Sequence, residues 1–466
     1  MNIVFYGLVL LSMVFATVGG VPERDAVVAS GVAVVDAPAG AAKEDPVELG
    51  PSRTPGKIES VEAGRATVRV SAADGATTVR FPRQSAMAAV SKASLDSAKG
   101  AIEFALGLVG AMTLFLGLMK VLEAAGGLDA ISRLLRPAMV RLFPDVPPDH
   151  PAMGAMIVNL AANVLGLTNA ATPFGIKAMQ ELEKLNPRPG VATNSMVLFL
   201  AINTSGVAVL PTGMIAMRAS LGSTSPASIF ATTLLATSLN TIVAIFAAKG
   251  LQRFFGGQPP GDVPRTNVPL LTLIPMIIAL SGIIALIATV YRFGDLANAW
   301  IVPGLIFGLL TIGVVRKVRV YEVFITGARD GFETGVKIMP YLVGILVTVA
   351  MFRASGGMGY LVDFLTPAVA LIGMPAEVLP VALLRPLSGT GAFGITAEIM
   401  RTHGPDSHVG QLAATMQGSS ETTFYVLAVY FGSVGITRLR HAVPVGLISD
   451  AAGVLASLFA VAWLLG

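Results

Sequence analysis

Long apolar segments, separated by short charged ones, dominate the chain after residue 95. About 20 residues of helix cross a hydrocarbon core of ~30 Å. Windows of that length with few or no charged side chains predict membrane spans at about 101–121, 193–217, 228–248, 268–290, 296–315, 337–353, 409–436 and 442–466. Together with an apolar N-terminal segment from Ile3 to Val21, they indicate an all-α polytopic membrane protein with about nine spans.

Two further apolar stretches, 151–180 and 377–400, are interrupted by Pro, Gly and polar residues. Non-helical backbone at membrane depth persists only where protein or a water-filled cavity satisfies its polar groups. We therefore expect each stretch to form a re-entrant hairpin or a broken helix.

Residues 22–95 have no long apolar run. Apolar and polar residues alternate in GKIESVEAGRATVRVSAADGATTVRFP, on either side of Ala73-Asp74-Gly75, which predicts a small β-hairpin module. Residues 22–50 are expected to form a linker. The segment 1–21 lacks the basic n-region of a signal peptide, so a retained first span is favoured over a cleaved leader.

Composition supports the membrane assignment. Hydrophobic residues make up 54% of the 466 positions and charged residues only 13%, against about 25% charged in a soluble domain. The net charge of +4 is small for this length and is better explained by cytoplasmic basic loops than by nucleic-acid binding. The chain has no cysteine, which excludes disulfides, thiolate metal sites and a cysteine nucleophile.

Basic residues follow several predicted spans and orient them, because Lys and Arg favour cytoplasmic loops. These residues are Arg133, Arg136, Arg141, Lys177, Lys184, Arg188, Lys249, Arg253, Arg265, Arg316, Lys317, Arg319, Arg438 and Arg440. All can be cytoplasmic together if the N-terminus is inside, residues 22–95 are outside, and both broken stretches return to the side they left.

Two distant segments match at a constant offset, which indicates an internal repeat. The matches pair Lys99 with Arg329, Glu103 with Glu333, Gly126-Gly127 with Gly356-Gly357, and Pro137-Ala138 with Pro367-Ala368. In the topology above, span 101–121 and its partner 337–353 run in opposite directions. This predicts an inverted repeat, as in secondary transporters whose discontinuous helices form a midplane site. The predicted regions are 1–21 (first span), 22–95 (extracytoplasmic module), 96–255 (first half) and 256–466 (connecting spans and second half).

Polar residues cluster at equivalent places in the two halves. The first cluster lies between Asn159 and Pro173, and its members are Asn159, Asn163, Thr168, Asn169 and Thr172. A helix is expected to restart at Ala170-Ala171-Thr172-Pro173, where free N–H groups would favour an anion or a polar substrate. The alternative is that these side chains only join neighbouring helices. Further on, Asn203-Thr204-Ser205 corresponds to Ser419-Ser420-Glu421 of the second half.

The second cluster is RPLSGTGAFG, from Arg385 to Gly394, and it includes Ser388 and Thr390. It contains a G-x-G-x-x-G spacing, but no predicted strand precedes it, so a glycine-rich helix break is favoured over a dinucleotide site. A buried Arg385 should pair with an acid or meet an anionic substrate, and the alternative is that it extends to the membrane surface.

The third cluster surrounds Glu421, the one charged residue between Val409 and Ile436. Its polar members are Gln417, Ser419, Ser420, Thr422, Thr423 and Tyr425. An ionisable residue inside a span is a functional-site hypothesis, with Arg385, a cation or a proton as its partner, although a purely structural ion pair is the alternative. Asp450 is the lone charge of the last span, and its approximate counterpart in the first half is Asn240.

These motifs resemble a known family. HPAMGAMIVNLAANVLGLTNAATPFGIKAMQELEKLNP and FLAINTSGVAVLPT resemble spore maturation protein A, whereas EVLPVALLRPLSGTGAFG and MQGSSETTFYVLAVYFGSVGITRLRHAVPVGLISD resemble spore maturation protein B. The resemblance implies a fusion of the two, with two Gate-type (nucleoside recognition) membrane domains in the bacterial inner membrane. Residues 22–95 depart from the family pattern.

Together these observations predict a secondary transporter of a small polar solute, nucleoside-like or anionic, with Na⁺ or H⁺ as the coupling ion. The expected lining is Asn159, Asn163, Thr168, Asn169, Thr172, Asn203, Thr204, Ser205, Arg385, Ser388, Thr390, Gln417, Ser419, Ser420, Glu421, Thr423 and Asp450. No H-E-x-x-H, P-loop or G-x-S-x-G motif occurs, so we expect neither an enzyme nor a metal or cofactor. A homo-oligomer is an open expectation. The alternative function is a membrane scaffold or sensor that uses residues 22–95.

Overall fold

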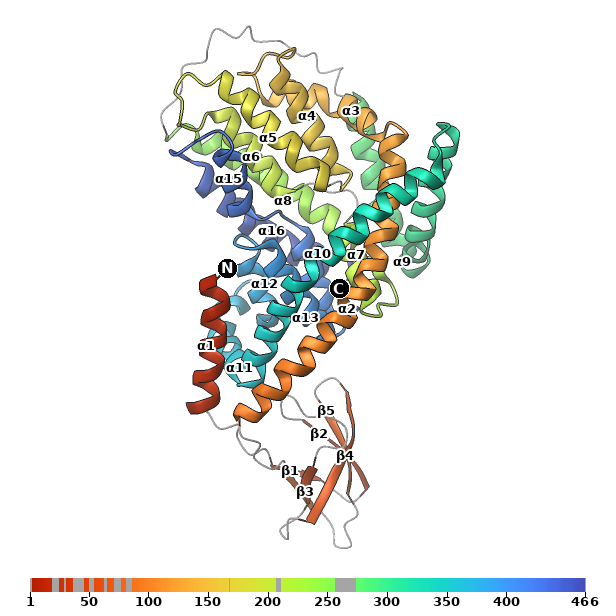
Figure 1. Cartoon of the computed structure of the whole chain (residues 1–466), viewed down its shortest axis with the longest axis vertical. Coiled ribbons are helices and arrows are strands. Elements are labelled where there is room, and N and C mark those ends of the chain that lie inside the picture. The colour runs from red at the N-terminus through yellow and green to blue at the C-terminus, as the bar shows by residue number, and fades with distance from the viewer. Residues whose placement is uncertain are drawn as a thin grey trace. The chain divides into compact units, whose positions relative to one another are not determined.

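The computed structural model describes residues 2–18, 25–28, 31–36, 46–49, 54–62, 65–70, 77–80, 86–166, 168–206, 211–255 and 274–465 (Figure 1). Most of the described chain is helical. Four helical segments in it are long and apolar enough to cross a membrane, namely Met87–Ala124, Pro226–Leu251, Val320–Ala354 and Ala442–Leu464. They coincide with four of the predicted spans. The total of nine spans stays a prediction.

The helices of the first half follow the N-terminal helix α1 (Asn2–Val18) and the strands. They are α2 (Ala86–Ala124), α3 (Gly127–Leu142), α4 (Pro151–Val164), α5 (Thr168–Lys184), α6 (Asn194–Ser205), α7 (Thr212–Ser220) and α8 (Ile229–Leu251), with the short helix η1 (Pro226–Ser228) before α8.

After the connecting helix α9 (Ile274–Val315), the same order of elements recurs. The second set is α10 (Val320–Ala354), α11 (Gly357–Ala370), α12 (Leu379–Leu384), α13 (Gly389–His403), α14 (His408–Gly418), α15 (Thr423–Gly432) and α16 (Ala442–Leu464), with η3 (Ala376–Val378) before α12. Even the turns agree. Gly126 before α3 and Gly356 before α11 have φ of 85° and 82°, a left-handed conformation that glycine adopts without a Cβ penalty.

Both stretches predicted to be broken are broken. Val164 ends α4 and Thr168 begins α5, while Leu384 ends α12 and Gly389 begins α13. In the first stretch the second helix begins at Thr168, earlier than predicted. Pro173 therefore lies inside α5 and not at its start.

Two segments predicted as clean spans are also broken, so those predictions were wrong. In the described part of 193–217, α6 ends at Ser205, the next residue Gly206 has a φ of 55°, and α7 begins at Thr212. Residues 409–436 form α14 and α15, and the break falls at the hydroxyl-rich residues 419–422. Hydroxyl side chains compete for backbone hydrogen bonds and so favour helix ends, a local effect that mean hydropathy does not register.

One predicted boundary is absent. The two predicted spans 268–290 and 296–315 correspond to the single helix α9, which begins at Ile274. Residues 268–273 of the first predicted span lie outside the described part. Arg292 and Asp295 interrupt the hydropathy there, but charged residues do not end a helix.

Six strands lie between α1 and α2: β1 (Asp25–Val28), β2 (Gly31–Asp36), β3 (Pro46–Leu49), β4 (Thr54–Glu62), β5 (Arg65–Val70) and β6 (Thr77–Arg80). They hydrogen-bond in the order β1-β6-β3-β4-β5-β2, and all pairs are antiparallel. The expected linker at 22–50 thus holds three strands. β4 pairs with β5, whereas β5 and β6 are not paired, and the predicted turn at Ala73-Asp74-Gly75 lies outside the described residues.

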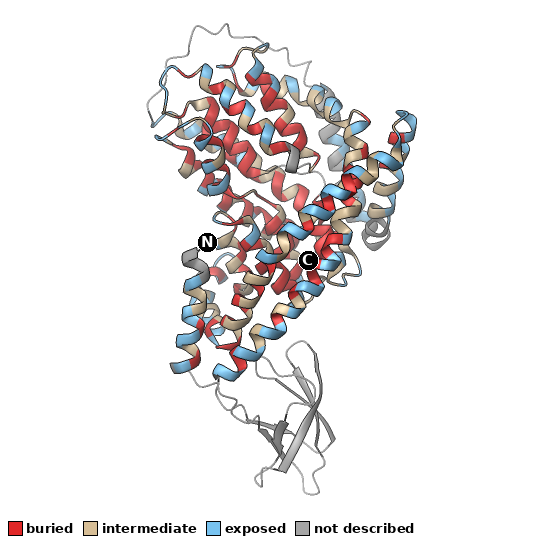
Figure 2. Ribbon diagram, in the orientation of Figure 1, coloured by how far each residue is buried: buried red, intermediate tan, exposed pale blue. Residues whose placement is uncertain are grey.

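The chain divides into two compact units, residues 1–104 with 339–377, and residues 105–338 with 378–466. In the first unit α1 packs on α11, where Phe15 stacks on Tyr360 with ring centroids 5.5 Å apart. The second unit holds all four broken helix pairs. Buried residues concentrate in its helices α4, α6 and α8 (Figure 2), and α8 packs along α16.

Basic loops meet at one end of the second unit. Arg440 Nη1 donates to the Ala192 carbonyl at 3.0 Å and to Asn194 Oδ1 at 2.9 Å, and Lys249 Nζ donates to the Leu142 carbonyl at 3.0 Å. The loops that precede α4 and α6, the end of α8 and the loop before α16 therefore lie together. Their basic residues are among those that the sequence predicts on a single membrane side. Arg265 lies outside the described residues.

Candidate functional site

The breaks of α6–α7 and α14–α15 meet. The backbone N–H of Glu421, in the 419–422 loop, donates to the Thr204 carbonyl at 2.7 Å, in the last turn of α6. Beside this bond, Thr241 Oγ1 of α8 donates to Ser205 Oγ at 2.8 Å. Thus the polar runs Asn203-Thr204-Ser205 and Ser419-Ser420-Glu421, matched in sequence, are also neighbours in space.

Arg385 is directed at the 419–422 loop from the end of α12. It is 8% exposed, and its guanidinium donates to Thr422 Oγ1 at 3.0 Å and to the Ser420 carbonyl. Its Nη2 lies 3.8 Å from Glu421 Oε2, so the predicted pair exists but is loose. The Glu421 side chain is 46% exposed, and Arg385 Nε has no hydrogen-bond partner among the described residues.

The glycine-rich break between α12 and α13 brings further polar groups to the same loop. Ser388 caps α13, with its Oγ accepting from the Gly391 N–H at 3.0 Å, and Gln417 Nε2 donates to the Gly389 carbonyl at 3.4 Å. A Cβ on Gly389 would collide with Thr422 Oγ1, so glycine is what allows the two breaks to approach. Helices α12 and α13 flank the G-x-G-x-x-G spacing.

Asp450 of α16 faces this cluster. It is 8% exposed, and neither of its carboxylate oxygens has a hydrogen-bond partner among the described residues. The Thr423 hydroxyl and the Arg385 guanidinium lie near enough to act on its charge. Thr423 packs against α16 at Gly446, one helical turn before Asp450, and its fully buried hydroxyl also lacks a partner of hydrogen-bond geometry in the described structure.

Asn240 of α8 joins α16 to the loop. Its Nδ2 donates to the Ser419 carbonyl at 3.0 Å, and its Oδ1 accepts from Ser449 Oγ at 2.8 Å. A Cβ on Gly453 would lie 3.1 Å from Asn240 Nδ2 and 3.2 Å from Ser419 Oγ. The residue matched in sequence to Asp450 therefore lies against the same helix.

A second polar group lies farther along α4 and α6. Asn163 Nδ2 donates to Asn203 Oδ1 at 2.9 Å, and Tyr430 Oη donates to the same oxygen at 3.4 Å. Asn159 Nδ2 donates to the Ala171 carbonyl at 2.8 Å and to Tyr430 Oη at 3.3 Å. This group thus joins both arms of the first broken pair to α15 of the second half.

Four predicted residues are not gathered by these contacts. Thr168 and Asn169 open α5, but their side chains lie outside the described part of the chain. Thr172 is half-buried in α5, and the described structure shows no hydrogen bond from its side chain to the other predicted residues. Thr390 is exposed, with its Oγ1 3.5 Å from Ser388 Oγ.

Sequence reasoning missed several participants. Tyr430, Asn240, Thr241 and Ser449 lie within apolar helices and match no motif, and Asn240 was named only as the counterpart of Asp450. A signal for Tyr430 does exist. Gly175 leaves room for it, since a Cβ there would overlap the Tyr430 hydroxyl, but only the fold shows that the two are opposite each other.

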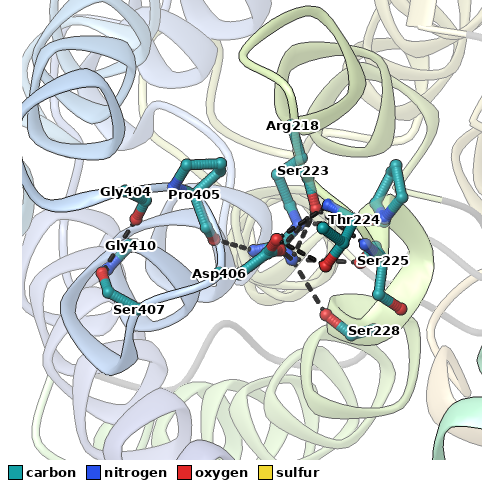
Figure 3. A network of polar contacts seen from close by, with 11 residues as sticks. Arg218, Ser223, Thr224, Ser225, Ser228, Gly404, Pro405, Asp406, Ser407 and Gly410 are labelled. Carbon is teal, nitrogen blue, oxygen red and sulfur yellow. Dashed lines mark hydrogen bonds and ion pairs between the residues drawn. The ribbon is translucent and has the colours of Figure 1, made fainter.

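At the other end of the second unit, Arg218 of α7 forms a separate network (Figure 3). It is fully buried, and its Nη2 lies 2.8 Å from Asp406 Oδ1 and 2.9 Å from Ser228 Oγ. Its Nε donates to the Pro226 carbonyl at 3.1 Å, and its Nη1 donates to the Pro405 carbonyl. These contacts join the α7–α8 connection to the α13–α14 loop.

Asp406 is held in its charged form. Burial on its own raises the pKa of this carboxyl, but hydrogen bonds from Ser223 and Thr224, together with the charge of Arg218, outweigh it and leave the pKa below its usual value. Every charge in this network has a close partner, so it fits a joint better than a binding site.

The cluster around the 419–422 loop offers different chemistry. Amides and hydroxyls can donate to and accept from a polar solute, Arg385 can meet an anion, and Glu421 and Asp450 can carry a cation or a proton. Groups of three or more His, Cys, Asp or Glu that could hold a metal ion are absent from the described residues.

Comparison with known proteins places these elements in a family. The family model described as nucleoside recognition (Gate) matches residues 105–252 and 335–437, which contain the broken helix pairs. The structure of the YdaH transporter from Alcanivorax borkumensis aligns over 100% of this chain and 99% of its own at 14% identity, but its TM-score of 0.39 is too low to establish a shared fold.

Two curated relatives each match about a third of the chain. Spore maturation protein B of Bacillus subtilis (strain 168) is 49% identical over 165 residues, which are 35% of this chain and 93% of that protein. Spore maturation protein A of the same organism is 46% identical over 166 residues, 36% of this chain and 83% of that protein. The chain thus belongs to the nucleoside recognition (Gate) family of membrane proteins, as a protein that joins a spore maturation protein A-like part to a spore maturation protein B-like part.

Proposed function

We propose that this protein is a secondary transporter of a small polar solute in the bacterial inner membrane. The observation that carries the proposal is the hydrogen bond from the Glu421 N–H to the Thr204 carbonyl, because it joins two helix breaks at corresponding positions of the repeated element order. Discontinuous helices that meet in this way supply unpaired backbone groups and polar side chains for a solute within a bundle.

An inverted arrangement of the two halves is part of the proposal. Helices α6–α7 begin beside Arg440 and end at the Arg218 network, whereas α14–α15 begin at that network and lead toward Arg440. These contacts support opposite directions for the two broken pairs. Nine spans, with residues 22–95 outside and the basic loops inside, complete the topology.

The solute class follows from the side chains at the junction. Asn163, Asn203 and Tyr430 suit the hydroxyls and amides of a nucleoside-like molecule, while Arg385 suits an anionic group. The description of the matching family model, nucleoside recognition, favours the first.

Flux in proteoliposomes tests the proposal. Labelled uridine and adenosine serve as nucleoside probes and citrate serves as an anion probe. We expect flux of at least one, reduced by Asn203→Ala and unchanged by Asp149→Asn, a substitution of a carboxylate that is 96% exposed. The absence of flux of every probe through folded protein would contradict it.

A test on residues 22–95 distinguishes the transporter from the alternative function, a membrane scaffold or sensor. The names of the spore maturation relatives also allow that alternative. A variant in which a short linker replaces residues 25–80 should keep the flux. A protein without flux whose cellular role depends on that segment would favour the scaffold.

A further inference from the structure

Asp450 is a buried acid in the described part of the second unit. This residue is 8% exposed, and neither of its carboxylate oxygens has a hydrogen-bond partner among the described residues. An isolated carboxylate that is removed from water is strongly disfavoured, and such groups become neutral or acquire a partner. The Asp450 carboxylate must therefore be neutralised where it lies, by a bound proton or by a positively charged partner.

The charges that face Asp450 can be named. Arg385 acts on it from the end of α12, and Glu421 acts on Arg385 in turn. Of the helices packed against α16, α8 presents Asn240 and α15 presents Thr423 here, and both side chains are uncharged. One guanidinium thus faces two carboxylates, and the cluster lacks one positive charge.

A proton meets this need better than a metal ion does. A metal cation at Asp450 would lie beside the Arg385 guanidinium, which repels it. Hard cations also take about six oxygen ligands, whereas Thr423 supplies a single hydroxyl oxygen beside the carboxylate. A proton needs a single oxygen and adds no new ligands.

Building on the proposed function, we infer that Asp450 is the proton-binding site of the transporter and that its protonation controls the 419–422 loop through Arg385. With the proton on an Asp450 oxygen, the carboxyl is neutral and Arg385 holds the Ser420 carbonyl, Thr422 Oγ1 and Glu421. When the proton leaves to solvent, the carboxylate competes for the guanidinium, whose Nε has no partner.

A movement of Arg385 would reach the solute site through the backbone of the 419–422 loop. Within the described structure, the hydrogen bonds and the ion pair of the Arg385 guanidinium are all with the 419–422 loop, and that loop donates the hydrogen bond to Thr204. Movement of Arg385 toward Asp450 loosens the junction of the two broken pairs. This assigns the coupling proton to Asp450, not to the half-exposed Glu421 that the sequence favoured.

Infrared difference spectroscopy of the full chain in lipid nanodiscs tests proton binding without any solute. We expect a neutral-carboxyl C=O band that disappears in Asp450→Asn and remains in Glu421→Gln. Glu398→Gln is the matched control, because Glu398 is equally buried but lies 3.4 Å from Arg401. Spectra of the wild type and Asp450→Asn with identical carboxyl bands at every pH would overturn the inference.

Flux measurements test the coupling separately. Asp450→Asn should lose accumulation driven by a pH gradient, and whatever solute flux remains in it should no longer change with pH. Accumulation that follows a Na⁺ gradient and ignores pH would overturn the proton assignment. If no probe is transported but the infrared band behaves as expected, the proposed function fails and the proton site stands.

Discussion

Two buried arginines in the second unit have contrasting surroundings. Arg218 is 0% exposed, and its guanidinium is fully engaged by carbonyls, hydroxyls and Asp406 at 2.8 Å (Figure 3). Arg385 is 8% exposed, but its nearest carboxylate is at 3.8 Å, one of its nitrogens has no partner in the described structure, and the unbonded Asp450 lies close by.

The difference separates a structural charge from a functional one. A buried polar network with every member satisfied rigidifies the fold, whereas an incompletely satisfied group needs another explanation, such as a missing ligand or a catalytic role. Burial alone does not distinguish the two arginines. The two arginines differ in whether every guanidinium nitrogen has a hydrogen-bond partner. Substitutions at the two sites should therefore have different effects.

The largest change in stability is expected at Asp406. Asp406→Asn leaves the buried Arg218 without its countercharge. Because the Asp406 side chain is 35% exposed, the cost should lie between the ~1 kcal/mol of an exposed pair and the ~3–5 kcal/mol of a buried one. Circular-dichroism melts in detergent measure it. The control Asp149→Asn removes the carboxylate of an exposed pair and should cost less than about 1 kcal/mol. Equal losses in the two variants would show that the Arg218 network is not a joint.

Arg385→Met should have an intermediate effect. It removes two hydrogen bonds to the 419–422 loop, each worth about 1 kcal/mol, while the abandoned Glu421 is 46% exposed and stays hydrated. Flux should be lost although most of the protein remains folded at room temperature. A melting curve as damaged as that of Asp406→Asn would place Arg385 with the structural charges.

The pH dependence of stability should contain a contribution from Asp406. Because its pKa is lowered in the fold, its stabilising effect is present above the ordinary carboxyl pKa of 3.8 and is lost as the pH falls through the lower folded value. The difference in stability between the wild type and Asp406→Asn should begin to shrink only as the pH falls below 3.8 and should vanish below the lowered folded pKa. A constant difference down to the lowest accessible pH would contradict the assignment.

The smallest change in stability is expected at Asp450, where function should change most. Asp450→Asn removes a carboxylate that has no hydrogen bond in the described structure, so the melting temperature should stay the same or rise. The readout is a melt and a pH-driven flux assay on the same preparation. A loss of stability comparable to that of Asp406→Asn would remove the contrast between the two arginines.

Sequence reasoning found the second arginine but not the first. Arg385 lies in an apolar stretch beside a glycine-rich break, and Glu421 is a lone acid, so each was a local anomaly. Arg218 and Asp406 are ordinary loop residues in sequence, and only the fold brings them together across 188 positions. Breaks marked by proline and glycine, as in 151–180 and 377–400, were predicted. Those within 193–217 and 409–436 were not, because their apolar residues dominate the average.

The hydrogen bond that joins the two halves runs from the Glu421 amide to the Thr204 carbonyl, so it belongs to the main chain on both sides. Substitution of either side chain leaves both atoms in place, with proline at 421 as the exception because it has no N–H. The atoms of this hydrogen bond therefore do not depend on which side chains residues 204 and 421 carry. Over evolutionary time, the residues facing a solute could change in one half at a time. Selectivity could then diverge while the hydrogen bond between the two halves is kept.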